Sequence, residues 1–245
     1  MDLAARFSEL KSGFARSFWV ANVLELFERF SFYGSKIVLA VFLAETVGLG
    51  PFGVSLVGLY GFAVYFLPIL AGPVVDRFGF KKSLAACFAI FSLGYFLIGL
   101  SGMPMGQPLV SAVGTKTWVV CALLITAVGG SLIKPCIVGT VARTTTKDTK
   151  ALGYSIYYTL VNIGGWLGPV LASQVRVSLG IAQVLVGASL VSFLLFLGTL
   201  VFFKEPARDP GAEERTLGKV LKDAALVLAN GRFIGFLVIF TGFWV

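Results

Sequence analysis

Five ionisable residues lie inside long apolar stretches of this sequence, namely Glu25, Glu28, Arg29, Lys36 and Lys134. A charged side chain at the centre of a membrane helix costs about 2.5–3.5 kcal/mol on insertion scales, so it faces a partner or a water-filled cavity rather than lipid. The chemistry available to this group is therefore that of an enclosed polar site, comprising ion pairing, anion binding and proton transfer.

Most of this group shares one helical face. Glu25, Arg29, Tyr33 and Lys36 follow one another at spacings of four, four and three residues, and Glu28 lies beside this stripe. With Lys134, three cations stand against two carboxylates, which leaves a charge of +1 when all five groups are ionised. A buried surplus cation requires an anion. A substrate carboxylate, or an acid from a second half of the protein, would supply it.

The two carboxylates can also bind protons. Loss of water favours the neutral acid, whereas a nearby Arg or Lys favours the carboxylate. Opening the cavity or moving the cation changes this balance and ties proton binding to conformation. Since the chain contains no histidine, Glu25 and Glu28 are the expected proton carriers. The structural alternative is an ion-pair cluster that only holds helices together.

The composition places these residues in a membrane. The chain has 245 residues, of which 57% are hydrophobic and 13% charged, whereas soluble domains average about 25% charged residues. A bilayer core about 30 Å thick requires about 20 apolar helical residues. We expect membrane helices at residues 17–45, 51–76, 82–101, 117–142, 153–175 and 181–203.

The basic residues gather in alternate loops. They precede the first expected helix, lie between the second and third and between the fourth and fifth, and follow the sixth, whereas the opposite loops hold only Lys116 and Arg176. Because Lys and Arg accumulate in cytoplasmic loops, we expect a multi-pass protein of the cell membrane with a cytoplasmic N-terminus. Its net charge of +8 then reflects topology in the lipid bilayer, and we expect no nucleic-acid partner.

Four regions follow from these patterns. We expect an interfacial N-terminal helix at residues 1–16, a six-helix transmembrane bundle at 17–203, a cytoplasmic linker with an amphipathic helix at 204–231, and the start of a truncated seventh transmembrane helix at 232–245. A helix from Phe233 to Val245 is only about 20 Å long, which is too short to cross a bilayer. Small residues at Gly164 and Gly168 favour close helix packing.

Four segments carry sequence motifs. Glu25-Leu-Phe-Glu28-Arg29-Phe-Ser-Phe-Tyr33-Gly34 fits the pattern ExxERFxxYG, and Gly130-Ser-Leu-Ile-Lys134-Pro135 fits GxxxKP. The segment Gly72–Lys82 contains a basic loop motif, and Tyr154–Gly164 is aromatic and ends in Asn162-Ile-Gly164. Together these segments resemble the proton-coupled oligopeptide transporter family of the major facilitator superfamily. The loop motif alone indicates only the superfamily.

The resemblance implies an all-α protein of the major facilitator type, of which this chain is the six-helix N-terminal bundle. It implies symport of di- and tripeptides with protons as the coupling ion, without a cofactor, and in partnership with a C-terminal six-helix half. It assigns proton coupling to Glu25, Glu28, Arg29 and Lys134, substrate binding to Arg29, Tyr33, Lys36, Tyr60, Lys134 and Asn162, and a gating loop to Asp76, Arg77, Lys81 and Lys82. Lys36 replaces the usual Arg, Phe32 a Tyr and Cys136 an Asn, and these departures bear on which peptides are preferred.

Two other functions are compatible with parts of this pattern. One is an exporter or antiporter of another small solute on the same scaffold, which the ExxERFxxYG motif disfavours. The other is a non-transporting fragment, because alternating access needs two bundles around a shared site and we expect no uptake by this chain alone. No nucleophile with a base, nucleotide loop or metal-ligand spacing occurs in the sequence, so we expect neither an enzyme nor a metal site.

Overall fold

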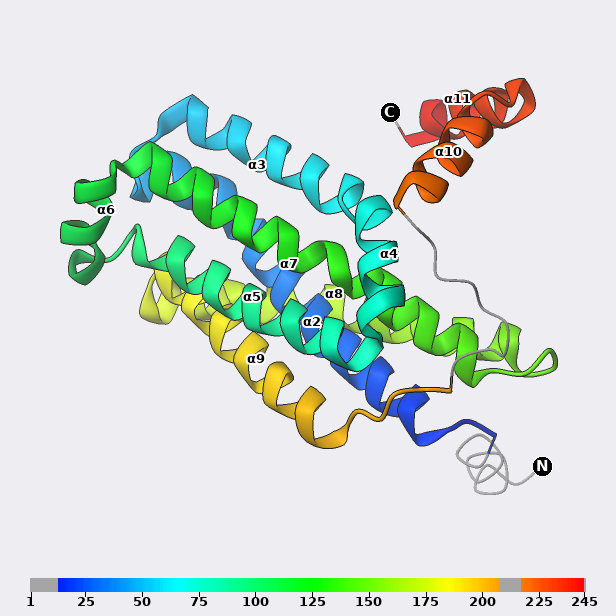
Figure 1. Cartoon of the computed structure of the whole chain (residues 1–245). Coiled ribbons are helices and arrows are strands. Elements are labelled where there is room, and N and C mark those ends of the chain that lie inside the picture. Colours follow the sequence, from blue (N-terminus) through cyan, green and yellow to red (C-terminus); the bar gives the residue numbers. More distant parts are fainter. Residues whose placement is uncertain (1–12, 208–216, 245) are drawn as a thin grey trace.

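The structure is a computed structural model that describes residues 13–207 and 217–244. Its regular elements are helices, and the long ones form one bundle (Figure 1). The bundle consists of α2 (Arg16–Val41), α3 (Gly50–Phe66) with α4 (Pro68–Phe78), α5 (Phe80–Leu100), α7 (Thr115–Thr144), α8 (Lys150–Leu179) and α9 (Ile181–Phe202). The predicted all-α bundle with six crossing segments is confirmed. Most of the interfacial helix predicted at residues 1–16 falls outside the described residues.

Hydropathy alone identifies only part of this bundle. Among the described helices, α5, α7 and α9 are long and apolar enough to cross a membrane, and α3 with α4 makes a fourth segment if the bent pair is one span. The α2 helix falls short because it contains Glu25, Glu28, Arg29 and Lys36, and α8 is rich in glycine and polar residues. Hydropathy thus does not identify α2 and α8, and these two helices supply charged and polar groups of the bundle.

The second predicted membrane helix, residues 51–76, is not continuous. It is divided into α3 and α4, whose axes differ by 45° at Leu67. Pro68 has no backbone N–H and its ring clashes with the carbonyl of the preceding turn, so the helix bends there. The sequence predicted one span with Pro68 inside it, and the structure adds the bend at this proline.

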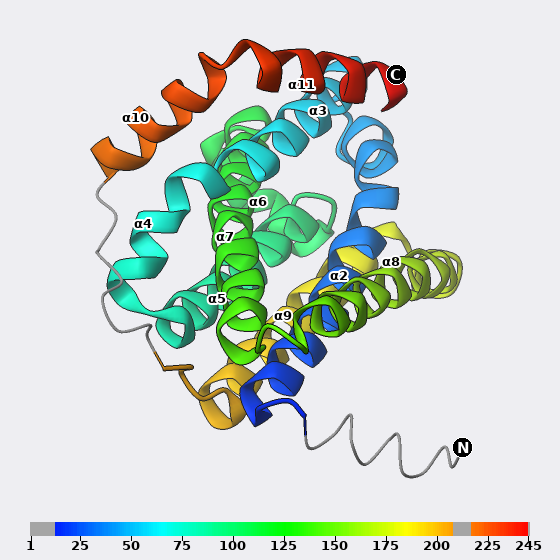
Figure 2. The same cartoon turned by 90° about the vertical axis from the view of Figure 1, so that its right-hand side faces the viewer.

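Short helices join or follow the long ones. A π-helical turn (η1, Phe42–Thr46) extends α2, and η2 (Pro104–Gly106) with α6 (Gln107–Val113) connects α5 to α7. After the bundle come α10 (Leu217–Leu228), which lies within the predicted linker, and α11 (Gly231–Trp244). Figure 2 shows both helices along the side of the bundle formed by α4 and α3, away from α9.

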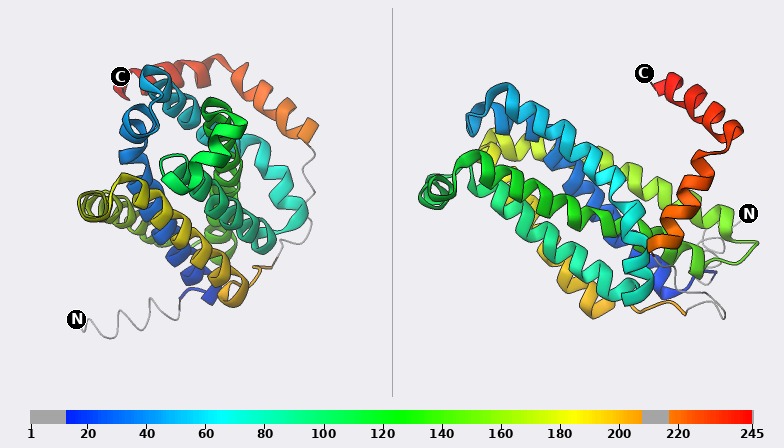
Figure 3. Two further views of the ribbon diagram at one scale, coloured as in Figure 1. Left: turned by 90° about the vertical axis from the view of Figure 1, so that its left-hand side faces the viewer. Right: turned by 45° about the horizontal axis from the view of Figure 1, so that its top comes forward.

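Glycines bring α2 and α8 into close contact. A Cβ atom added at Gly164 would lie 2.4 Å from the Leu26 carbonyl oxygen, and one at Gly168 would lie 2.3 Å from that of Phe30. Only glycine allows the two backbones to approach so closely. The predicted role of the Gly164 and Gly168 spacing is therefore confirmed, and α2 and α8 lie side by side in Figures 1 and 3.

The apolar core lies between α2, α5, α7 and α9. Its largest fully buried side chains include Phe18, Phe42, Phe88 and Phe91. The same helices bury Glu25 and Glu28, so apolar side chains surround the charged cluster.

Candidate functional site

A three-residue cluster joins α2, α7 and α8 at the centre of the bundle. The Lys134 Nζ of α7 lies 2.6 Å from Glu25 Oε1 of α2 and 2.7 Å from the Tyr157 hydroxyl of α8. Tyr157 donates to the same Glu25 oxygen at 3.3 Å. The Glu25 side chain is fully buried, whereas that of Lys134 is 39% exposed. The cation thus neutralises a buried carboxylate while it keeps access to the surface.

A second ion pair lies next to the first on α2. Arg29 donates from Nη2 to Glu28 Oε1 at 2.7 Å and from Nε to Glu28 Oε2. Both carboxylate oxygens of Glu28 are thereby occupied, and the guanidinium also lies over the Phe32 ring at 4.7 Å from its centroid. Arg29 Nε is 3.6 Å from Glu25 Oε1, which links the two pairs. The predicted proton-coupling residues therefore form one continuous network.

Lys36 is the surplus cation of the charge count. Its side chain is exposed, and within the described part of the chain it forms no ion pair with a carboxylate. Its ammonium group lies over the rings of Phe32 and Tyr65, at 5.7 and 5.9 Å from their centroids. An aromatic-lined, accessible ammonium is suited to bind an anion.

The other predicted substrate residues lie in different surroundings. Tyr33 is partly buried and its ring packs against Gly165 of α8. Asn162 is exposed on α8. Tyr60 is buried in the core, where its hydroxyl neighbours that of Tyr95. The structure thus brings Tyr33 into the network of α2 and α8, and buries Tyr60 away from the surface.

Two tyrosines of the site were absent from the predicted set. Tyr157 bonds both Lys134 and Glu25, and Tyr65 is 66% exposed next to Lys36. The aromatic segment of α8 and the polar residues of the second span were visible in the sequence. Their partners were not, because these come from other helices.

The predicted gating loop is helical in the structure. Asp76 and Arg77 lie at the end of α4 and Lys81 and Lys82 at the start of α5, so only Gly79 separates the two helices, at the end of the bundle where α9 finishes. Arg77 and Lys82 are exposed, and Asp76 is partly buried. Phe80 and Lys81 donate their backbone N–H groups to the two carboxylate oxygens of Glu205, at 2.7 and 2.6 Å. A carboxylate at this position satisfies free N–H groups at the start of α5 and complements the helix dipole.

Glu205 was missed by sequence reasoning, although an acid directly after the sixth span was visible. Gly79 allows the contact, since its φ of +85° suits glycine and a Cβ there would lie 3.1 Å from Glu205 Oε1. The loop is further packed by Arg143, whose guanidinium lies 4.1 Å from the centroid of the Phe80 ring.

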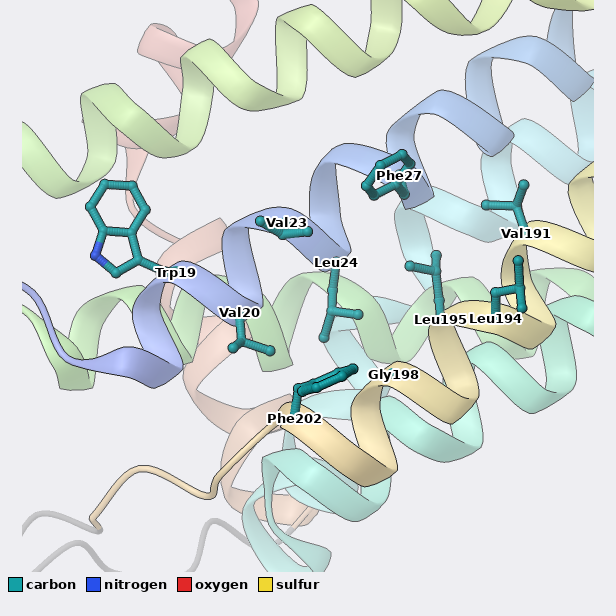
Figure 4. A pocket seen from close by; sticks show the side chains of 10 residues that line it. All are labelled: Trp19, Val20, Val23, Leu24, Phe27, Val191, Leu194, Leu195, Gly198 and Phe202. Atoms are coloured by element: carbon teal, nitrogen blue, oxygen red, sulfur yellow. The ribbon is translucent and has the colours of Figure 1, made fainter. Parts of the chain in front are cut away.

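An apolar groove lies apart from the charged cluster. It has a volume of about 490 Å³ and is lined by apolar residues of α2 and α9 (Figure 4). No group of three His, Cys, Asp or Glu side chains in the described ranges could hold a metal ion. The charged network and this apolar groove are therefore separate features.

The bundle of long helices around a buried network of acids and bases has the major-facilitator-type fold. The sequence pattern described as Major Facilitator Superfamily matches residues 22–245, so the chain belongs to this superfamily. The resemblance to its oligopeptide transporter family is also confirmed, because the chain matches relatives named as di- and tripeptide transporters or permeases and solved structures of POT peptide transporters.

Among the relatives, a di-/tripeptide transporter of Lactococcus lactis subsp. lactis is 30% identical over 200 residues, covering 76% of this chain and 38% of the relative. Dipeptide and tripeptide permease A of Erwinia pyrifoliae is 25% identical over 202 residues, covering 81% and 39%. The chain thus spans about two-fifths of the length of these relatives.

The fold agrees with two solved structures at low identity. A peptide transporter POT in complex with sulfate has a TM-score of 0.64 at 21% identity, covering 92% of this chain and 45% of the other. The POT family transporter PepTSo has a TM-score of 0.64 at 19% identity, covering 80% and 40%. At these identities the comparison establishes the fold.

Proposed function

We propose that this chain is the N-terminal bundle of a proton-coupled symporter of di- and tripeptides. The observation that carries the proposal is the network in which Lys134 bonds a fully buried Glu25 and Tyr157 while Lys36 stays accessible. The relatives are named as di- and tripeptide transporters or permeases, which supplies the substrate class. A second six-helix half, the lipid bilayer and a short peptide are the partners this function requires.

Lys36 is the group we assign to the peptide carboxylate. Arg29 was the other candidate, but both of its bonded nitrogens already serve Glu28. Lys36 has aromatic neighbours and no carboxylate within ion-pair distance in the described ranges. A free carboxylate on the substrate would balance this charge once a second half of the protein encloses Lys36.

Glu25 is the group we assign to the proton. Its Oε1 accepts from Lys134 and Tyr157, whereas its Oε2 is buried and receives no hydrogen bond from the described residues. A proton on Oε2 therefore displaces no existing bond. In Glu28 both oxygens are bonded to Arg29, so a proton there would break a paired contact.

Proton binding and peptide binding are then coupled through Lys134. A neutral Glu25 holds the ammonium less strongly, because the charge–charge attraction is lost. Lys134, already 39% exposed, can then shift its ammonium group toward the peptide whose carboxylate Lys36 binds. Release of the proton restores the Lys134–Glu25 pair and withdraws Lys134 from the peptide. The charge distribution of the loops supports an N-terminus in the cytoplasm of a cell-membrane protein.

The proposal is tested by transport in a full-length protein. A fusion of this chain to the remaining part of the Lactococcus lactis relative is reconstituted in liposomes, and uptake of a labelled dipeptide is competed with the same dipeptide bearing a free or an amidated C-terminus. We expect the free acid to compete at least about tenfold better, as a hydrogen bond to a charged group contributes about 1.5–3 kcal/mol. Lys36→Gln should remove most of this difference.

Lys116→Gln is the matched control. Lys116 is also an exposed lysine over a phenylalanine ring, at 5.3 Å from the centroid of Phe52, but lies outside the network. It should leave the preference for the free acid unchanged. Equal competition by the acid and the amide in the unmodified fusion would reject the carboxylate site, and absence of dipeptide uptake by a correctly inserted fusion would reject the function.

A further inference from the structure

The groove between α2 and α9 is apolar along its whole length. It is lined by Trp19, Val20, Val23, Leu24, Phe27, Val191, Leu194, Leu195, Gly198 and Phe202. Val23 and Phe27 on one wall and Leu194 and Phe202 on the other are 47–56% exposed. Figure 4 shows Val20, Leu24 and Phe202 between the two helices, with Trp19 at one end. Its open side suits a long, thin apolar ligand.

The groove is about as long as one leaflet of a bilayer is thick. Trp19 to Phe27 spans about 12 Å of α2, and Val191 to Phe202 spans about 17 Å of α9, at 1.5 Å per residue. Half of a hydrocarbon core of about 30 Å is about 15 Å. Trp19 lies at the end where α2 begins, and tryptophan is enriched at the membrane–water interface. The groove therefore extends from the interface to about the midplane.

Basic residues flank the interfacial end. Arg16 begins α2 one turn before Trp19, and Lys204 follows Phe202 by two residues; both side chains are exposed. The neighbouring acid, Glu205, is bonded to the start of α5 and is not available to neutralise them. Gly198 has no side chain and so leaves the bottom of the groove open; a Cβ added there would first meet Leu24, at 3.8 Å. An anionic headgroup above an apolar chain matches this arrangement.

We propose that this groove is a binding site for an anionic phospholipid of the leaflet at the Arg16 end, which the loop charges predict to be cytoplasmic. One acyl chain lies between α2 and α9, and the phosphate lies between Arg16 and Lys204. Juxtamembrane Lys and Arg attract anionic lipids, and the apolar walls hold the chain by contact area. The site is independent of peptide or proton binding.

Trp19 provides a reporter inside the proposed site. The full chain with Trp118, Trp166 and Trp244 replaced by Phe is placed in bilayers containing phosphatidylglycerol or phosphatidylcholine with brominated acyl chains, and quenching of Trp19 fluorescence is measured. We expect stronger quenching by the brominated anionic lipid at equal mole fraction. Replacing both Arg16 and Lys204 by Gln should reduce this preference by about thirtyfold, since each cation contributes roughly 1 kcal/mol. Far-UV circular dichroism checks that each variant is helical.

Filling the groove separates binding at this site from general contact with lipid. Gly198→Leu places a side chain on the groove floor and should lower quenching by both lipids. Gly187→Leu is the matched control on α9, because a Cβ there meets nothing within 4 Å, and it should leave quenching of Trp19 unchanged. Equal quenching by the two brominated lipids overturns the anionic preference, and unchanged quenching in Gly198→Leu overturns the groove as the binding site.

Discussion

Replacing Lys134 by Met removes the cation that neutralises a fully buried carboxylate. Two unit charges 2.6 Å apart attract one another by about 6 kcal/mol at an effective dielectric constant of 20, before desolvation is counted. Removing one partner of a buried pair costs about 3–5 kcal/mol. Lys134 is 39% exposed and Arg29 Nε remains 3.6 Å from the same Glu25 oxygen, so we expect Lys134→Met to lower the free energy of unfolding by about 2–3 kcal/mol.

The double variant Lys134→Met with Glu25→Gln contains no unpaired charge at this position. It should recover about 2 kcal/mol of the loss, because the neutral amide no longer needs a cation partner.

The measurement is unfolding of the full chain in mixed micelles, followed by far-UV circular dichroism. Lys36→Met is the matched control, because Lys36 forms no ion pair in the described part of the chain, and it should change the stability by no more than about 0.5 kcal/mol. Additive effects of the Lys134 and Glu25 substitutions would refute the pairing.

Two further predictions concern the scaffold. Gly168→Ala places a Cβ 2.3 Å from the Phe30 carbonyl oxygen and should destabilise the bundle by about 1–3 kcal/mol, whereas Gly187→Ala, with nothing within 4 Å, should not; equal melting temperatures for the two variants would contradict the close contact of α2 and α8. Glu205→Gln removes the charge that caps α5 and should cost about 1 kcal/mol. Lys204→Gln serves as its control, and a loss that persists unchanged at high salt would argue against the electrostatic part of this contact.

The fold could be predicted because its signals are local. Five of the six spans end within about three residues of their predicted limits or continue into an adjoining turn. The glycine spacing of α8 predicted a close helix contact, and the structure shows that its partner is α2. The bend at Leu67 was not predicted, although Pro68 was visible. Proline is tolerated in membrane helices at many positions, and tertiary packing decides where it produces a bend.

The charged residues of the site could be predicted, but their pairing could not. The spacing on α2 allowed either carboxylate to meet Arg29 or Lys134. The structure pairs Lys134 with Glu25, 109 residues away in sequence, and Arg29 with Glu28. Side-chain geometry across three helices decides which carboxylate each cation pairs with, and the sequence spacing does not contain this information. For the same reason Lys36 was identified as one of three cations but not as the accessible one.

The assignment of the proton to Glu25 is tested most directly by measuring uphill accumulation and exchange together. Proteoliposomes containing the fusion protein are given an inward proton gradient, and accumulation of a labelled dipeptide is compared with its exchange against unlabelled dipeptide at equal pH. In Glu25→Gln we predict that gradient-driven accumulation is lost while exchange persists, since a permanently neutral side chain cannot bind and release a proton. Accumulation in Glu25→Gln equal to that of the unmodified fusion would contradict the account.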